Sequence, residues 1–393
     1  MRRRLWLAPL LWAMAAGPAV GVRAERTDDP VFADAARTAW RYVESRYRPE
    51  TGLVDGAVGW EHATMWDAGS VLAAFVSARE LGLLPAEECT RRVERVLKTL
   101  ADVPLVDGAT FARAYATRGG GPRGDGGWSP TDVGRLLLWL KIVAAQEPRL
   151  AAQAEAVARR SDFSRVLRDG YMWGTRSAKG QHAEFQEGRL GYEQYAAAGF
   201  AAWGFPVDKA RSFTWNAIPV QVMGQPLLAD MRGFDRLTSD PIVLYGLELG
   251  WPDEAKGLAR ALLAAQEERW KRTGQVTIVG EDAIGIAPHF FFYYCAYTNA
   301  KEFAVDVQDP SAVVSGPRWI SAKSTFAWHA LLPGEYTRRA VEAVQPAASG
   351  RGWASGVFEG GRRSTGGENV NTEAIILEAA AYARRGAPLI EAR

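Results

Sequence analysis

The sequence is poor in the residues that build disulfide frameworks and metal centres. It has two cysteines, Cys89 and Cys295, and four histidines among 393 residues. Two cysteines cannot supply a disulfide scaffold or a thiolate zinc site, and no two histidines have the i, i+4 spacing that lets one helix hold a metal ion. We therefore expect neither a metal nor a cofactor. An oxidising compartment would permit a Cys89–Cys295 bond, and two buried free thiols are the equal alternative.

A large net charge and long apolar runs are also missing. The whole chain carries +2, and residues 1–24 contain four arginines and no acidic residue, so the chain without them carries −2. This balance does not indicate a nucleic-acid-binding surface. Beyond residue 24, no stretch reaches the roughly eighteen apolar residues of a membrane span. We predict no span in the mature chain, and the pattern does not indicate an oligomeric state.

The first 24 residues have the pattern of a secretory signal peptide. A basic start, Met1–Arg4, precedes the short apolar segment Leu5–Val20, and Val22-Arg23-Ala24 resembles a small-x-Ala cleavage site. An uncleaved membrane anchor is the alternative, although the apolar run is short for a span. We predict cleavage near Ala24, export to the periplasm and a single domain over residues 25–393.

Helical spacing of apolar residues runs through most of the mature chain, where apolar segments alternate with amphipathic ones. The apolar segments are Thr64–Leu83, Ser129–Ala145, Leu190–Trp203, Pro241–Leu249, Ser324–Leu332 and Asn371–Arg384. The amphipathic partners begin at Asp29-Pro30, Pro85, Pro148, Pro252 and Glu335.

A helix that is apolar all round must be buried on all sides. Six such helices wrapped by about six amphipathic ones predict an all-α fold, an (α/α)6 toroid. Two insertions, residues 170–188 and 271–320, carry extended patterns such as Gln275–Val279. We expect short strands or long ordered loops there.

Acidic residues collect near the starts of the apolar helices, which open on one face of a toroid. The catalytic candidates are Glu193, Asp240, Glu281 and Asp67. Each also has a structural interpretation. Asp67 and Asp132 follow a hydroxyl residue by three positions, as in a capping box, and Asp240 precedes a proline, as an N-cap does. Glu193 could pair with the arginine four residues earlier, and Glu281 and its acidic neighbour could be solvated.

Aromatic residues are abundant: 15 tryptophans stand among 42 aromatic residues. Several of these tryptophans lie in glycine-rich loops, where packing needs them least. Flat aromatic faces suit the apolar faces of sugar rings, and glycosidic cleavage uses two carboxyl groups. The candidate substrate-binding residues are Trp60, Trp66, Trp128, Arg189, Tyr192, Arg232, Asp282, Trp353, Asn369, Asn371 and Glu373.

The motifs resemble a bacterial family of exported proteins of unknown function, related to the glucoamylase-like (α/α)6 toroids that include endo-β-1,2-glucanases. The resemblance spans about residues 30–385 and is most specific at Gly-Arg-Leu-Gly-Tyr-Glu, residues 188–193. The chain departs from the family pattern at Gly280, where a serine is usual, and at Glu373, where an asparagine is usual. The resemblance implies a hydrolase of a periplasmic glucan or exopolysaccharide, by analogy of fold.

Three functions follow as hypotheses. The first is a glycoside hydrolase, inverting, with Glu193 as acid and Asp240 as base, followed by Glu281 and Asp67 as alternative bases. The second is a polysaccharide lyase with Tyr192 or His182 as base and Arg232 or Asn369 neutralising a uronate. The third is a glycan-binding or assembly protein without catalysis. In each case the partner is an oligo- or polysaccharide.

Overall fold

The computed structural model describes residues 29–123, 127–178, 181–232, 236–296, 302–307 and 317–390. The predicted signal peptide lies outside these ranges. No helix within them is long and apolar enough to cross a membrane. Cys89 and Cys295 are both buried free thiols.

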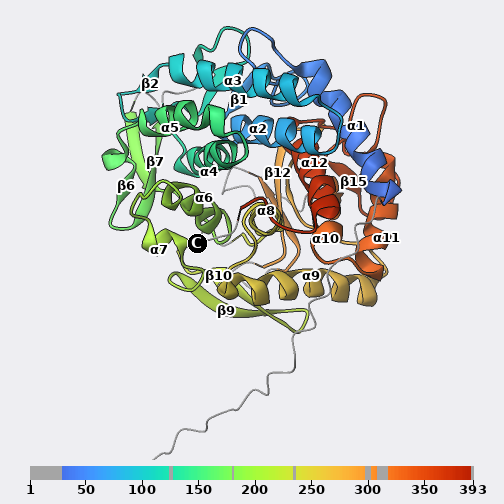
Figure 1. Cartoon of the computed structure of the whole chain (residues 1–393). Helices are drawn as coiled ribbons and strands as arrows, with labels where there is room; N and C mark the ends of the chain where they lie inside the picture. Colours follow the sequence, from blue (N-terminus) through green and yellow to red (C-terminus); the bar gives the residue numbers. More distant parts are fainter. Residues whose placement is uncertain are drawn as a thin grey trace, which may run out of the picture.

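Six buried helices form a closed inner ring. They are α2 (Met65–Glu80), α4 (Pro130–Gln146), α6 (Tyr192–Ala201), α8 (Asp240–Glu248), α10 (Ala322–Leu331) and α12 (Val370–Arg385). Each packs against the next along the chain, and α12 packs against α2, which closes the ring (Figure 1). On α2, residues such as Val71, Leu72 and Phe75 are fully buried. The predicted (α/α)6 toroid is confirmed.

A second set of helices lies outside this ring. It comprises α1 (Pro30–Arg46), α3 (Ala86–Asp102), α5 (Ala151–Arg159), α7 (Asp208–Arg211), α9 (Asp253–Thr273) and α11 (Glu335–Val344). Short 3-10 turns occur at Pro148–Leu150, Phe163–Arg165 and Gln345–Ala347. The outer helices bury one face only, because solvent covers the other. The outer helix before α8 is the four-residue α7, too short to be recognised from apolar spacing.

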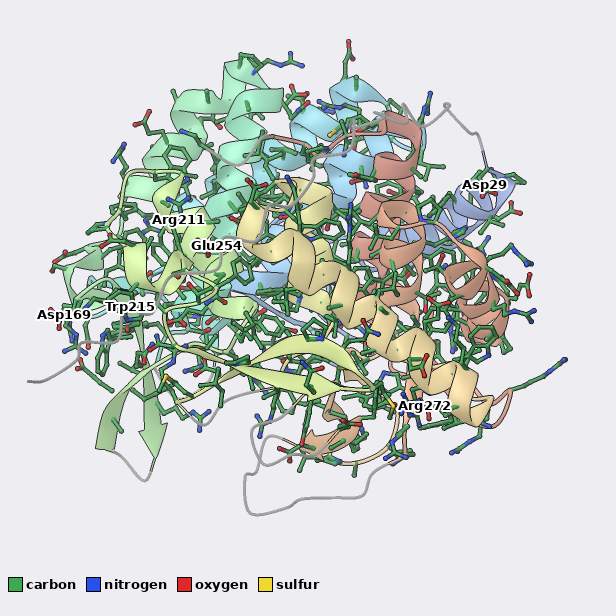
Figure 2. The ribbon with its side chains drawn as sticks, turned by 90° about the horizontal axis from the view of Figure 1, so that it is seen from below. Asp29, Asp169, Arg211, Trp215, Glu254 and Arg272 are labelled. Carbon is green, nitrogen blue, oxygen red and sulfur yellow. The ribbon has the colours of Figure 1, made fainter. Side chains whose placement is uncertain are left out.

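Short antiparallel strands occupy the connections. The sheets are β1 (His62–Thr64) with β4 (Ala114–Ala116) and β5 (Pro122–Arg123); β2 (Leu105–Val106) with β3 (Thr110–Phe111); β6 (Leu167–Arg168) with β7 (Tyr171–Ala178) and β8 (Gln181–Gln186); β9 (Ala217–Val222) with β10 (Gln225–Asp230); β11 (Glu281–Ala283) with β12 (Phe290–Tyr294) and β13 (Ala304–Val307); and β14 (Trp319–Ser321) with β15 (Gly356–Phe358). Figure 2 shows the hairpins gathered at one side of the ring.

The two insertions contain short strands and ordered loops, as predicted. The β7–β8 hairpin lies within residues 170–188, and β11–β13 lie within residues 271–320. Residues 275–279 do not form a strand, however, and the β9–β10 hairpin was not predicted. Several strands end directly before an inner helix: β1 before α2 and β14 before α10. The strands therefore fix the positions of the helix starts.

A fully buried ionic group lies inside the inner ring. Arg135 of α4 donates to Glu248 of α8 (3.0 Å), to Glu378 of α12 (3.1 Å) and to the hydroxyl of Tyr195 of α6 (2.5 Å). Tyr195 in turn donates to Glu248 (2.6 Å), as does the indole of Trp139 (2.9 Å). We call these five residues the inner-ring cluster. It ties four inner helices together.

Candidate active site

Glu193 lies at the second position of α6 and is fully buried. Arg232, which follows β10, grips both of its carboxylate oxygens, with Nη1 3.1 Å from Oε1, and the amide of Gln186 donates to Oε1 at 2.9 Å. The same guanidinium also binds Asp230 through Nε (2.9 Å). Burial raises the pKa of Glu193, and Arg232 opposes that rise. The predicted structural partner, Arg189, is not the residue that pairs with Glu193.

Arg189 binds Glu281 instead. Its Nη1 lies 2.9 Å from Oε2 of Glu281, and its Nη2 donates to Oε1 at 3.2 Å. The guanidinium carbon also lies 4.5 Å from the ring centroid of Tyr192 and 5.0 Å from that of Phe292. Arg189 lies just before α6, where its carbonyl accepts the amide N–H of Glu193 (2.9 Å), so the start of α6 is linked both to Glu193 and, through the Arg189 side chain, to Glu281. The side chain of Glu281 is 12% exposed, so water can reach it.

Asp240 is part of a buried triad with Lys323 and Asp282. The ammonium of Lys323 lies 2.7 Å from Asp240 and 3.2 Å from Asp282. Burial raises the pKa of Asp240 to about 6, and Lys323 opposes the rise. Asp240 also accepts the amide of Glu281 (2.8 Å), and it is the first helical residue rather than the N-cap. The N-cap is Ser239, so the N-cap interpretation of Asp240 was wrong by one position.

Asp282 also binds a buried aromatic side chain. It is 1% exposed and accepts the indole N–H of Trp319 at 2.7 Å. A contact between Asp282 and a sugar would require opening this interior. We call Glu193, Arg232, Asp230, Arg189, Glu281, Asp240, Lys323 and Asp282 the helix-start cluster.

A second pair of carboxyl groups lies at the start of α4. Asp132 completes only half of a capping box: its amide donates to the Ser129 hydroxyl (3.2 Å), which also hydrogen-bonds its carboxylate. Ser129 donates to Glu187 (2.7 Å), whose other oxygen lies 3.9 Å from Arg113. Burial raises the pKa of Asp132 to about 8, and the neighbouring charge of Glu187 adds to the rise.

The acidic and amide residues near α2 and α12 act mainly as caps. Asp67 and Thr64 form a complete capping box, and the amide of Asn371 donates to Asp67 at 2.8 Å. Asn369 caps α12 by accepting the amide N–H of Thr372 (3.0 Å). Glu373 is fully buried, where it accepts the backbone N–H of Trp353 (2.7 Å). Only Asn371 of this group is partly exposed.

The predicted aromatic platforms divide into two groups. Trp353 and Trp128 are each 2% exposed and donate their indole N–H groups to backbone carbonyls, so their rings pack in the hydrophobic core. This burial contradicts their assignment as sugar platforms. Trp66 is partly exposed and lies 5.5 Å from the ring of Tyr192, and Trp60 is 37% exposed. These two remain available to a ligand. The side chain of His182 lies outside the described residues.

The site is narrow as it stands. The space that borders Glu281, between Arg189, Arg236, Thr238, Phe292, Tyr293 and Tyr294, is too narrow to enclose a water molecule. Ligand pockets usually measure roughly 300–1,000 Å³. A sugar chain would therefore reach the carboxyl groups only if the side chains around them moved.

Several site residues escaped the sequence analysis. Lys323 lies in an apolar segment. It is buried beside two carboxylates, Asp240 and Asp282, which belong to distant parts of the chain. Its position in an otherwise apolar helix was the available signal, since buried lysine needs a partner. Glu187, directly before the Gly-Arg-Leu-Gly-Tyr-Glu motif, and Arg113 carried no comparable signal. Among the described residues, no group of three or more His, Cys, Asp or Glu side chains is arranged to hold a metal ion.

Comparisons with known proteins identify a family and several solved structures with the same fold. A model of the family described as "Protein of unknown function (DUF3131)" matches residues 34–386. Curated proteins give no significant match. A Bacteroides fragilis protein with the provisional name glucoamylase has a TM-score of 0.67 at 14% identity, over 94% of each chain.

Two further solved structures show how varied the chemistry on this fold is. An endo-β-1,2-glucanase from Chitinophaga pinensis, solved with sophorotriose and glucose, has a TM-score of 0.66 at 12% identity, over 92% of this chain and 93% of the other. A cellobiose 2-epimerase from Bacillus thermoamylovorans has a TM-score of 0.53 at 10% identity, over 89% of this chain and 99% of the other. At these identities the likeness shows the fold, and the reaction must be argued from the site.

Proposed function

The chain belongs to the DUF3131 family of proteins of unknown function, and from its helix-start cluster we propose that it is a glycoside hydrolase that cleaves a β-glucan. The observation that carries this proposal is the first turn of α6, which contains Glu193 and, through Arg189, holds Glu281. Two carboxyl groups from distant segments are thus attached to one helix start, and glycosidic cleavage uses such a pair.

We assign the proton donor to Glu193. General acid catalysis needs an oriented carboxyl group that still holds its proton near the working pH. Arg232 and Gln186 orient this one, and burial raises its pKa. Arg232 has a second partner in Asp230, so it can release Glu193 without losing its own charge compensation. Release would raise the pKa of Glu193 further, because the opposing cation moves away. The carboxyl of Asp132 has a raised pKa too, but it belongs to the separate carboxyl pair at the start of α4.

We assign the activation of water to Glu281 rather than to Asp240. Asp240 is 1% exposed and bound by Lys323, so in this arrangement water does not reach it. It holds the backbone N–H of Glu281 and thereby positions that residue. Asp67 is occupied by its capping box and by Asn371. A water activated by Glu281 would attack the anomeric carbon and invert its configuration.

The charges at the site favour a neutral substrate. The three cations of the helix-start cluster, Arg189, Arg232 and Lys323, are each paired with a carboxylate. An anionic uronate would have to compete with these carboxylates for each cation. This pairing argues against a polysaccharide lyase. A β-glucan carries no charge, and the endo-β-1,2-glucanase relative supports this choice of substrate class.

The test is incubation of the purified protein with linear and cyclic β-glucans and with uronate polymers. We expect new reducing ends from a β-glucan, and an α-anomer as the first product in NMR spectra, as inversion requires. Unsaturated products would favour the lyase, and tight binding without products would favour a glycan-binding protein. A first product with the β-configuration would overturn the inverting assignment.

We also propose that the protein acts in the periplasm. The support is the pattern of residues 1–24, with a basic start, a short apolar segment and a small-x-Ala site. The expected mature N-terminus is Glu25. Terminal sequencing of protein taken from the periplasmic fraction checks this, and an intact Met1 on protein found only in the cytoplasm would contradict it.

A further inference from the structure

Exposed apolar side chains gather on one surface beside the helix-start cluster. Trp215 is 59% exposed, Met231 is 61% exposed and Ile218 is 37% exposed. They are three of the seven exposed large apolar residues of the described chain, and all lie within a stretch of seventeen residues. Such a concentration of exposed apolar surface is typical of a binding site. Figure 2 labels Trp215 at the edge of the molecule.

Hydrogen bonds hold this surface in a defined shape. The backbone N–H of Trp215 donates to Ser212 (3.2 Å), and that of Met231 donates to the carbonyl of Asn216 (2.9 Å). The amide of Asn216 donates to the hydroxyl of Tyr171 (3.1 Å). The loop after α7, the end of β10 and the start of β7 therefore form one surface that is in place before any ligand arrives.

The composition of the surface matches a sugar chain. The ammonium of Lys209 lies 5.3 Å from the ring centroid of Tyr171 and 5.8 Å from that of Trp215, so one donor borders both aromatic rings. Flat rings contact the apolar C–H faces of sugars, while Lys209 and the Asn216 amide can bind sugar hydroxyls. A protein partner would need about 20–30 residues on each side, far more than this surface offers.

The surface is continuous with the proposed catalytic carboxyl group. Arg232 directly follows Met231, lies 5.9 Å from the ring centroid of Tyr171, and grips Glu193. A chain bound along Tyr171 and Trp215 would therefore meet Arg232 next and Glu193 after it. This direction agrees with the role of Arg232 as the residue that must release Glu193.

We propose that Tyr171, Trp215 and Met231 form a remote subsite that binds sugar units of a neutral polysaccharide, beyond the bond cleaved at Glu193. The proposal rests on the proposed function. It implies that the protein acts on long chains, because a unit at this surface and the cleaved bond must belong to one molecule. Short oligosaccharides would occupy the cleavage site without reaching Trp215.

The test compares Trp215→Ala with Trp215→Phe on β-glucan oligosaccharides of increasing length. Trp215→Ala should raise KM for long chains roughly tenfold, the effect of losing one aromatic contact, while kcat and the KM for the shortest cleaved substrate stay unchanged. Trp215→Phe should keep most of the wild-type KM. Val31→Ala, which removes an exposed apolar side chain from α1, is the matched control and should change nothing. Equal KM values for wild type and Trp215→Ala at every length would overturn the subsite.

A binding measurement separates the subsite from the catalytic proposal. Affinity electrophoresis in gels that contain β-glucan needs no turnover. If no β-glucan is cleaved but Trp215→Ala abolishes the retardation that Glu193→Gln keeps, the hydrolase proposal fails and the subsite stands. If β-glucan is cleaved and Trp215→Ala is retarded as strongly as wild type, the subsite fails and the hydrolase stands.

Discussion

The inner-ring cluster and the helix-start cluster both bury arginine among carboxylates, but they differ in what holds the partners. Arg135, Glu248 and Glu378 all lie on inner helices and are fully or almost fully buried. Arg232 lies beyond the end of a hairpin strand and divides its contacts between Glu193 and Asp230. Arg135 is completely buried, whereas the side chain of Arg232 is 20% exposed, so only Arg232 can exchange a carboxylate for water.

This difference separates a structural role from a functional one. A buried charge whose partner is removed destabilises the protein, because the remaining charge stays in a low-dielectric interior. A charge that borders solvent can exchange its partner during a reaction. We therefore expect changes in the inner-ring cluster to act on stability, and changes in the helix-start cluster to act on turnover and its pH dependence.

The largest effect should come from Arg135→Met, which leaves two glutamates without their cation inside the ring. We expect the free energy of unfolding to fall by about 3–5 kcal/mol, measured by urea denaturation. Arg91→Met is the control, since Arg91 is 68% exposed in its pair with Glu88 and such surface pairs contribute at most about 1 kcal/mol. If the Arg135 variant does not fold, Glu248→Gln provides a milder break with the same direction, because Arg135, Tyr195 and Trp139 all donate to Glu248. If both variants of the inner-ring cluster were as stable as wild type, that cluster would not have the structural role that distinguishes it from the helix-start cluster.

A smaller effect is expected from Arg232→Met, read in the pH profile of kcat. Arg232 lowers the pKa of Glu193 against the effect of burial. Without that cation the donor keeps its proton to higher pH, so the alkaline limb of the profile should move up by roughly one pH unit or more. Arg232→Lys retains the charge and should leave the limb near its wild-type position. An unmoved limb in Arg232→Met would mean that Arg232 does not act on the proton donor.

A separate effect, outside both clusters, is expected from Asp132→Asn and is read as stability against pH. The folded pKa of Asp132 is about 8, above its usual value of 3.8. The native state therefore holds a proton that the unfolded state loses, and stability falls as pH rises from about 4 to 8. Asp132→Asn should remove this pH dependence of stability. The free energy of unfolding of the variant should therefore rise relative to wild type as the pH approaches 8. Parallel curves for the two proteins would show that Asp132 titrates normally.

Local signals predicted much of the fold. Asp29 accepts the amide of Val31 at 3.0 Å, as the Asp-Pro start of α1 indicated, and the all-round apolar segments became the inner ring. The start of α10 was placed at Ser324 rather than Ala322, because Lys323 interrupts the apolar pattern. The lysine is tolerated there only because Asp240 and Asp282 approach it from other segments.

The site was predictable only in part, for the same reason. The acidic residues were recognised from their positions before apolar helices, but a sequence does not state which cation each will meet. Glu193 pairs with Arg232 and not with its helical neighbour Arg189, because the β9–β10 hairpin brings Arg232 to α6. Trp353 was judged by its glycine-rich surroundings, yet its loop folds inward against Phe326, with ring centroids 5.0 Å apart.

The most direct test of the account is a matched pair of substitutions, Glu193→Gln and Glu248→Gln, each measured for turnover per folded molecule and for free energy of unfolding. Glu193→Gln should lower turnover on a cleaved β-glucan by about two to four orders of magnitude, as expected for a lost general acid, while stability stays within about 1 kcal/mol of wild type. Glu248→Gln should lower stability by several kcal/mol, because Arg135 loses a buried partner, and should leave turnover near wild type. The reverse pattern, an active but unstable Glu193→Gln and a stable but inactive Glu248→Gln, would contradict it.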